Sequence, residues 1–245
     1  RVGQVNPNNG PSFVDPTDIV ISPTYDSDES LNFELGLKST LMDGRVQFNA
    51  AAYYIDWTDI QIDAVRVSDN RNFIANAGDA ISKGVEFELR ALPSDRLDLA
   101  LNLTLQDAEI DEISELNALL SGAREGDTLP GAGEVLASAR AHYVWDVLEN
   151  KQLVGGIGVQ YVDDSPNRFS FTPATGEPNA DFAINESYTN VDASLTLVGD
   201  QWDLTLYGEN LTDNGDAILN IGATLRNPIV TLRPRTVGLR LEYRF

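Results

Sequence analysis

Apolar and polar residues alternate along most of this chain with a period of two. The clearest segment places a leucine at every second position, at Leu97, Leu99, Leu101, Leu103 and Leu105. Because successive side chains of a β-strand point to opposite faces, this alternation predicts a strand with one apolar and one polar face. The pattern recurs in segments that start near residues 31, 46, 85, 97, 137, 153, 191, 202 and 237. We therefore predict about nine strands, many of them roughly ten residues long.

The connections between these strands alternate between tight turns and long polar loops. The tight turns centre on residue types that favour turn geometry, at Asp43-Gly44, Pro93-Ser94-Asp95, Glu149-Asn150 and Gly199-Asp200. The long loops run from about Thr58 to Asp79, Asp107 to Gly133, Asp163 to Ser187 and Asp213 to Ile229. Inside them, Ile60 to Val67 has the character of an extra strand and Glu112 to Leu120 that of a short helix. Every second connection is long, so all the long loops should lie at one end of the sheet.

Two architectures accommodate such strands. A soluble β-sandwich buries its apolar face, has shorter strands and has loops of similar length at both ends. A transmembrane β-barrel needs tilted strands of about 9 to 11 residues, unequal ends and aromatic residues near both membrane interfaces. The barrel is favoured by aromatic residues near strand ends, at Tyr54, Trp57, Tyr143, Trp145, Tyr161, Trp202, Tyr243 and Phe245. The lumen would then receive Arg45, Gln47, Asn49, Glu86, Glu88, Arg90, Asn102, Gln106, Arg140, Asp203 and Glu209.

The composition excludes several classes of function. Thirty-eight acidic residues outnumber 17 basic ones and give a net charge of -21, which argues against a nucleic-acid partner. The chain has no cysteine and a single histidine, His142, so thiolate nucleophiles and multi-histidine metal sites are absent. No stretch approaches the 18 consecutive apolar residues of a spanning helix. We predict neither a cofactor nor a metal site, and no catalytic residues.

Several local motifs permit a functional and a structural interpretation, and the structural one is favoured. The glycines of Gly155-Gly156-Ile157-Gly158 lie inside a strand, without the helix that a phosphate-binding loop requires. Acidic residues crowd the starts of two loops, at Asp107, Glu109, Asp111, Glu112, Glu115, Asp163 and Asp164, without the spacing of a dedicated calcium site. The loop aromatics either stack on a ligand or pack the loops together, and they are Phe73, Phe169, Phe171, Phe182 and Tyr188.

The order of motifs from about Leu31 onward resembles the C-terminal part of a TonB-dependent outer-membrane receptor. The matching segments are residues 32–38 (NFELGLK), 43–45 (DGR), 48–61 (FNAAAYYIDWTDIQ), 76–78 (NAG) with 84–88 (GVEFE), 208–213 (GENLTD) and the final strand ending at 243–245 (YRF). The resemblance implies an all-β antiparallel transmembrane barrel fragment, about nine strands of a 22-stranded barrel. It also implies short periplasmic turns, long extracellular loops and a location in the outer membrane of a Gram-negative bacterium.

The same resemblance sets the expected domains, function and partners. Residues 1–30 would be an extracellular loop segment, and residues 31–245 the C-terminal portion of the barrel, without the plug domain. The chain would serve TonB-energised uptake of a scarce nutrient, such as an iron chelate, cobalamin or an oligosaccharide. Its partners would be outer-membrane lipid, the small nutrient ligand and TonB, which the family contacts through an N-terminal part. The barrel-assembly machinery would read the terminal residues Leu239, Leu241, Tyr243 and Phe245.

Two rival functions remain at this point. A soluble, secreted β-sandwich that binds carbohydrate would bury the five leucines in a dry core instead of exposing them to lipid. An outer-membrane enzyme barrel would need a serine and histidine pair, and His142 has no obvious serine partner. Fold does not determine ligand, so the residues that contact a substrate are not assigned from the sequence.

Overall fold

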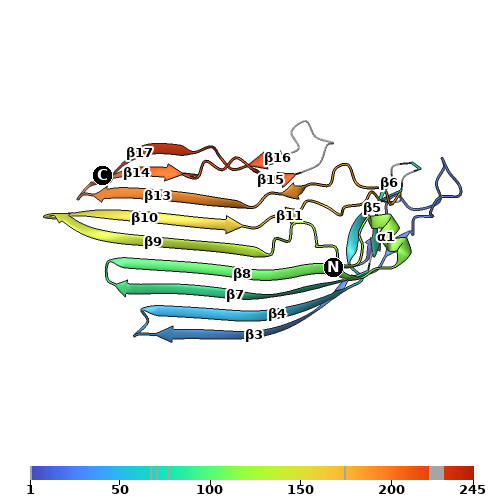
Figure 1. Cartoon of the computed structure of the whole chain (residues 1–245), viewed down its shortest axis with the longest axis horizontal. Coiled ribbons are helices and arrows are strands. Elements are labelled where there is room, and N and C mark those ends of the chain that lie inside the picture. Colours follow the sequence, from blue (N-terminus) through green and yellow to red (C-terminus); the bar gives the residue numbers. More distant parts are fainter. Residues whose placement is uncertain (1, 67, 70, 77, 174, 221–228) are drawn as a thin grey trace.

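The computed structural model describes residues 2–66, 68–69, 71–76, 78–173, 175–220 and 229–245. Its main element is one antiparallel sheet of nine strands, in which each strand pairs with its neighbours along the chain (Figure 1). These strands are β3 (Glu29–Leu41), β4 (Val46–Thr58), β7 (Asp79–Ser94), β8 (Leu97–Glu112), β9 (Val135–Leu148), β10 (Lys151–Val162), β13 (Tyr188–Val198), β14 (Trp202–Glu209) and β17 (Thr236–Tyr243). The prediction of about nine strands is confirmed, with lengths from 8 to 16 residues.

The register of the sheet separates an apolar face from a polar face. Leu101 lies opposite Leu89 and Ala139, whereas its neighbour Asn102 lies opposite Glu88 and Ser138. The described residues include no second sheet that covers the apolar face, and Leu101 remains 44% exposed there. A β-sandwich would bury these leucines between two layers, so the sandwich interpretation is wrong.

The apolar face forms a band with polar or aromatic borders. At one end Lys83, which pairs with Asp107 at 3.0 Å, lies in register with Tyr54. At the other end Tyr143 and Trp145 have ring centroids 4.7 Å apart, and Trp202 lies opposite Tyr243. The leucines of β8 between these borders span nine residues, from 97 to 105, which matches the roughly 9 to 11 residues of a tilted membrane-spanning strand.

Trp57 is the exception among the expected interface aromatics. It lies in register with Ser30 and Ala80, on the opposite face from Tyr54. Its indole Nε1 donates a hydrogen bond to Asp28 Oδ2 at 3.0 Å, and its ring packs against a buried apolar cluster. The interface prediction for Trp57 is therefore wrong, because β4 continues past the apolar band and an odd-numbered residue points to the polar side.

The two ends of the sheet differ as expected, with tight turns at one end and long connections at the other (Figure 1). The tight turns use left-handed residues such as Asp43 (φ 53°) and Asn150 (φ 59°). The long connections and the N-terminal segment contain β1 (Gln4–Val5), β2 (Thr24–Tyr25), β5 (Gln61–Arg66), β6 (Arg71–Asn76), α1 (Glu115–Ser121), β11 (Ser165–Pro166), β12 (Ile184–Asn185), β15 (Ala217–Asn220) and β16 (Ile229–Thr231).

Both secondary structures expected inside the loops are present. The extra strand appears as β5, paired with β6 in a hairpin, although Val67 lies outside the described residues. The helix α1 begins at Glu115, later than Glu112, because β8 extends to Glu112. Ser114 caps it by accepting a hydrogen bond from the backbone N–H of Asn117. None of the helical segments described is long and apolar enough to cross a membrane.

The buried apolar clusters lie in the connections and at the adjoining ends of the long strands β7 and β8. One cluster consists of Ile60, Ala80, Ile110 and Ala123. A second joins four separate segments through Ile21, Ala64, Phe73 and Leu120. We call residues 2–28, the β5–β6 hairpin and α1 together the cap. The cap is a packed structure with its own core. The alternation of apolar and polar residues in the sequence does not predict this core.

Tyr53 on β4 and Gly84 on β7 lie opposite each other in register. A Cβ at Gly84 would lie 2.6 Å from Tyr53 Oη and 2.7 Å from the backbone oxygen of Leu105. Replacing Gly84 with Ala should therefore lower stability by about 1–3 kcal/mol through overpacking. The measurement uses samples of the complete gene product that are incubated at increasing temperatures before electrophoresis. The unfolding temperature is the one at which the band of the folded form disappears.

Gly36→Ala is the matched control, because a Cβ at Gly36 would meet only ordinary contacts, at 3.8 Å from Ala50 O and 3.9 Å from Glu34 Oε1. Equal unfolding temperatures for the two variants would contradict the proposed role of ring packing over Gly84.

Candidate functional site

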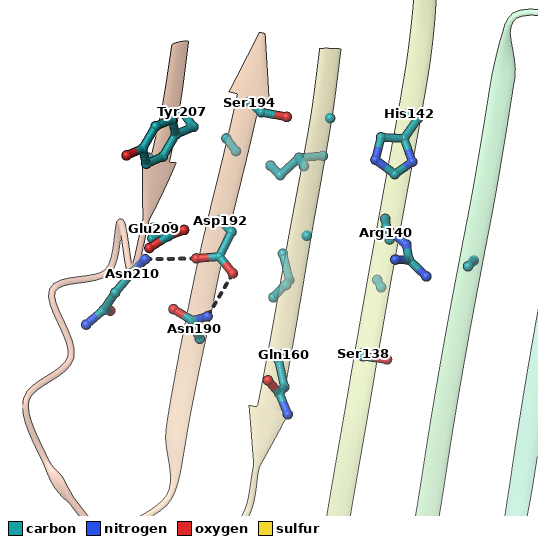
Figure 2. Close-up of a pocket in the computed structure, with 18 of the residues that line it drawn as sticks. Ser138, Arg140, His142, Gln160, Asn190, Asp192, Ser194, Tyr207, Glu209 and Asn210 are labelled. Atoms are coloured by element: carbon teal, nitrogen blue, oxygen red, sulfur yellow. Dashed lines mark hydrogen bonds between the residues drawn. The ribbon is translucent and has the colours of Figure 1, made fainter. Parts of the chain in front are cut away.

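The polar face of the sheet carries a cleft of about 930 Å³ over β8, β9, β10, β13, β14 and β17 (Figure 2). This volume falls in the range of small-molecule sites. The polar and charged side chains that line it include Asn102, Ser138, Arg140, His142, Gln160, Asn190, Asp192, Ser194, Thr196, Thr205, Tyr207, Glu209, Asn210, Arg233 and Arg240. They come from strands far apart in the sequence, and the β-sheet register brings them together. Of the residues predicted to face the lumen, Asn102, Arg140 and Glu209 lie here.

Glycines on the central strand β10 open the floor of this cleft. Gly158 lies in register with Arg140 on β9 and with Asp192 on β13. With two strand spacings of roughly 4.8 Å, the backbones of Arg140 and Asp192 are about 10 Å apart. A Cβ added at Gly158 would meet no atom within 4 Å. The positively charged Arg140 and the negatively charged Asp192 therefore flank the uncovered backbone of Gly158.

Gly156 occupies the next position along the same face of β10. A Cβ there would come within 2.8 Å of the His142 ring and 3.1 Å of Ser194 Oγ. The glycine thus allows the imidazole of His142 to lie over the strand. The glycine run 155–158 is part of β10, so the expectation that it does not form a phosphate-binding loop is confirmed.

Asp192 is held in place by hydrogen bonds at one end of the cleft. Its Oδ1 accepts from the backbone N–H of Asn210 at 2.8 Å, and its Oδ2 accepts from Asn190 Nδ2 at 3.0 Å (Figure 2). These bonds join the end of β14 to β13. The carboxylate of Asp192 is therefore held in the wall of the cleft by two hydrogen bonds.

Asn210 is the hub of the segment that follows β14. It is 4% exposed and has a left-handed backbone with φ 49°. Its Nδ2 donates to the carbonyl oxygens of Asn214 and Arg233, while its Oδ1 accepts from Thr212 Oγ1 and the N–H of Asn214. This buried amide connects β14 to the segment that enters β17. The role of the matching GENLTD segment is thus structural at Asn210.

Within the cap, the buried side chain of Arg66 joins the β5–β6 hairpin to residues 2–28. Its guanidinium donates to both oxygens of Asp69, at 3.0 and 2.7 Å, and to the carbonyl oxygens of Gly10, Pro11 and Ile19. Every N–H of this guanidinium therefore has an acceptor. The sequence analysis missed this residue, because its partners lie more than 45 positions away except for Asp69.

The Arg66–Asp69 pair also affects the pKa of the Asp69 carboxyl. The hydrogen bonds from Arg66 hold the pKa of Asp69 below its ordinary value of 3.8. A lowered carboxyl pKa stabilises the folded state at every pH above the unfolded pKa, and that contribution disappears as the pH falls through the folded pKa. The contribution of this pair to holding residues 2–28 on the β5–β6 hairpin is therefore insensitive to pH between about 5 and 8.

Most of the aromatic residues in the loops pack within the protein. Phe73 is buried in the second apolar cluster, and Phe169 packs against the first. Phe171 lies beneath the guanidinium of Arg124, 3.3 Å from the ring centroid. Of these loop aromatics Phe182 is 38% exposed, on the rim of a smaller cleft of about 360 Å³. Packing was one of the two alternatives from the sequence, and it accounts for the first three residues.

The acidic residues at the loop starts do not assemble into a metal centre. Asp107 and Glu109 both contact Lys83, at 3.0 and 3.7 Å, and Asp163 accepts a hydrogen bond from Tyr161 Oη at 2.8 Å. Within the described ranges, no group of three or more His, Cys, Asp or Glu side chains is arranged to hold a metal ion.

The predicted terminal signal residues lie on and just beyond the edge strand β17. Leu239, Leu241 and Tyr243 share one face, opposite Leu206, Leu204 and Trp202. The rings of Tyr243 and Phe245 are 5.1 Å apart, and Tyr243 Oη donates to Gln201 Oε1 at 2.9 Å. The structure brings these four residues together on the apolar face, away from the cleft.

Comparison with known proteins gives a consistent result. A family model described as "TonB dependent receptor-like, beta-barrel" matches residues 2–211. The ferric yersiniabactin uptake receptor FyuA from Yersinia pestis superposes with a TM-score of 0.68 at 18% identity, over 99% of this chain and 33% of that chain. The ferric-catecholate import receptor Fiu from E. coli K12 gives 0.64 at 19% identity, over 90% of this chain and 28% of that one.

A third similar structure is the copper transporter OprC, with a TM-score of 0.61 at 16% identity, over 89% of this chain and 31% of that chain. The chain thus spans about a third or less of the length of each of these proteins. Identities this low show a common fold.

The Arg66 contacts predict how the cap responds to substitution. Arg66→Met should cost about 3–5 kcal/mol, since it removes all the hydrogen bonds that the buried guanidinium donates and leaves Asp69 with the longer contact to Arg71. Limited proteolysis and hydrogen exchange of the complete gene product should show opening of residues 2–28. Arg71→Met is the control, because Arg71 contacts Asp69 at 3.3 Å from a more exposed position and should cost less than about 1 kcal/mol. A cap as protected in Arg66→Met as in Arg71→Met would contradict this role.

Proposed function

Because the chain belongs to the TonB-dependent receptor-like β-barrel family, we propose that it forms part of a receptor that imports a scarce nutrient with energy delivered through TonB. The chain is accordingly an outer-membrane β-barrel protein of a Gram-negative bacterium, and transporters rather than enzymes make up the family. The nutrient belongs to one of three classes: an iron chelate, cobalamin or an oligosaccharide. The similar receptors for ferric yersiniabactin and ferric catecholates favour an iron chelate among these.

The observation that carries this proposal is the contrast between the two faces of the sheet. One face is a continuous apolar band with no covering layer among the described elements, and the other is a polar wall with a ligand-sized cleft. Lipid contact on the first face and a water-filled, ligand-conducting lumen on the second explain both. Outer-membrane lipid is thus the partner of the apolar face.

The two ends of the sheet support an orientation. The tight turns would face the periplasm, and the long connections with the cap would face the outside. Residues 31–245 would contribute the C-terminal part of a 22-stranded barrel, and residues 1–30 an extracellular segment. Residues 2–28 pack on the β5–β6 hairpin through Asn6 and Arg66, which supports the extracellular placement. The strands β3 and β17 have free edges in this sheet, and the remaining strands would pair with them.

The terminal residues have a second role in this proposal. Leu239, Leu241, Tyr243 and Phe245 form an exposed apolar row on an edge strand, with Leu239 71% exposed. An exposed row on a free edge suits recognition by the barrel-assembly machinery before lipid covers it. TonB itself would act through parts of the protein outside this segment.

Adjacent residues of β8 provide a direct test of the membrane assignment. Leu101 and Asn102 lie next to each other but on opposite faces. Leu101→Arg should cost about 2–4 kcal/mol near the middle of the membrane, whereas Asn102→Arg points into the lumen and should be tolerated. The readout is the amount of heat-modifiable protein in the outer-membrane fraction. Equal yields of the two variants would contradict lipid contact on the leucine face.

Uptake itself is tested by growth. Deletion of the complete gene should abolish growth when one nutrient class is supplied at limiting concentration, and plasmid-borne wild type should restore it. Deletion of tonB should have the same effect, because the import is energised. Growth that is indifferent to the gene on iron chelates, cobalamin and oligosaccharides alike would overturn the proposed function.

A further inference from the structure

We propose that Arg140 anchors an anionic group of the imported ligand, a carboxylate or a phosphate, above Gly158 in the polar cleft. This inference rests on the proposed function, since it gives the chemical class of the ligand that the barrel takes up.

The first observation is that the described residues place no partner against the Arg140 side chain. Its neighbours in register are Ala100 on β8 and Gly158 on β10, and neither has a side chain long enough to reach the guanidinium. Its neighbours along the same face of β9 are Ser138 and His142 (Figure 2). The Arg140 side chain has no hydrogen bond or ion pair to any residue in the described part of the chain, so all five N–H donors are unused.

The carboxylates nearest in the sheet are already engaged. Asp98 on β8 is bound by Arg90 at 3.1 Å. Asp192, across Gly158, accepts hydrogen bonds from Asn210 N and Asn190 Nδ2. Asp98 and Asp192 are therefore both held by groups other than Arg140.

Most arginines in the described part of this chain have an ion-pair partner. Acidic residues outnumber basic ones by 38 to 17, so partners are plentiful. Nine other arginines form ion pairs within the described ranges: Arg45, Arg66, Arg71, Arg90, Arg96, Arg168, Arg235, Arg240 and Arg244. Arg140 thus has no ion-pair partner because its neighbours in register are small, and not because the chain has few acidic residues.

The local charge agrees with an anionic ligand. Three arginines (Arg140, Arg233 and Arg240) and two carboxylates (Asp192 and Glu209) line the cleft. Arg240 also contacts Glu242 at 3.9 Å, so these charged groups together are balanced, whereas the chain as a whole carries -21. A planar guanidinium binds a carboxylate or phosphate through two parallel hydrogen bonds, a geometry that suits an exposed side chain above a glycine floor.

The test uses the complete gene product, purified in detergent, with citrate and inorganic phosphate as probes in isothermal titration at constant chloride. The wild type should bind at least one probe. Arg140→Met should weaken that binding by about 10- to 100-fold, the effect of losing charge-assisted hydrogen bonds. Arg140→Lys should retain part of the affinity, since it keeps the charge but not the planar fork.

Arg45→Met is the matched control, because Arg45 was also predicted to face the lumen, pairs with Asp95 at 2.9 Å and does not line the cleft. It should bind both probes as the wild type does, and unheated gels should show that every variant is folded. Equal affinity in Arg140→Met and wild type would overturn the inference, as would a wild type that binds neither anion at millimolar concentration. A lowered unfolding temperature of Arg140→Met with unchanged anion binding would also overturn it, and would assign the guanidinium to a contact within the protein.

The growth assay keeps this inference separate from the proposed function. Gene-dependent uptake of a neutral nutrient that is unaffected by Arg140→Met would overturn the anion site and leave the receptor function intact. Anion binding that depends on Arg140, without gene-dependent growth on any nutrient, would support the site and overturn the receptor function.

Discussion

Backbone hydrogen bonding between neighbouring strands is the constraint on which the rest of this structure depends. A chain segment in hydrocarbon has no water to satisfy its N–H and C=O groups, so each strand must pair with its neighbours. The nine strands meet this requirement in simple sequence order, and only β3 and β17 keep a free edge. The same pairing sets the register, which places Leu101 toward lipid and Asn102 toward the lumen.

The usual division between a buried core and an exposed surface is inverted in the sheet. Many of its large apolar residues are exposed to the surroundings, while the buried apolar clusters lie in the cap, the connections and the adjoining ends of β7 and β8. This follows from the solvent, because lipid removes the need to hide the leucines, whereas the cap meets water and must bury Ile21, Phe73 and Leu120. The guanidinium of Arg66 then joins the chain segment before the first long strand to the hairpin after the second.

The functional cleft follows from the same pairing. Small residues at Gly156, Gly158 and Ala100 lower the floor between longer side chains, and the register brings Arg140 and Asp192 to either side of it. Asp192 is bound into the wall, and the guanidinium of Arg140 is left facing the lumen. In the proposed site, the carboxylate of Asp192 is therefore held by the protein, and the guanidinium of Arg140 binds the ligand.

The sequence by itself determined the strands, their two faces and the inequality of the two ends. Strand side chains repeat every two residues, so a pattern such as Leu97 to Leu105 specifies a face without knowledge of its neighbours. Even the hairpin strand β5 and the helix α1 were recognisable, because period and capping are local properties. Trp57 was misassigned, because a pattern does not show where along a strand the apolar band stops.

Only the tertiary structure decided which polar residues meet. Arg140, Gly158 and Asp192 lie on three strands and are separated by 18 and 34 positions in the sequence, and their meeting depends on a register that a one-residue slip would destroy. The contacts of Arg66 with Gly10 and Ile19 are likewise hydrogen bonds to backbone carbonyls, which every residue possesses and which leave no trace in the sequence. Local periodicity therefore defines the elements, while long-range hydrogen bonds define the cap and the cleft.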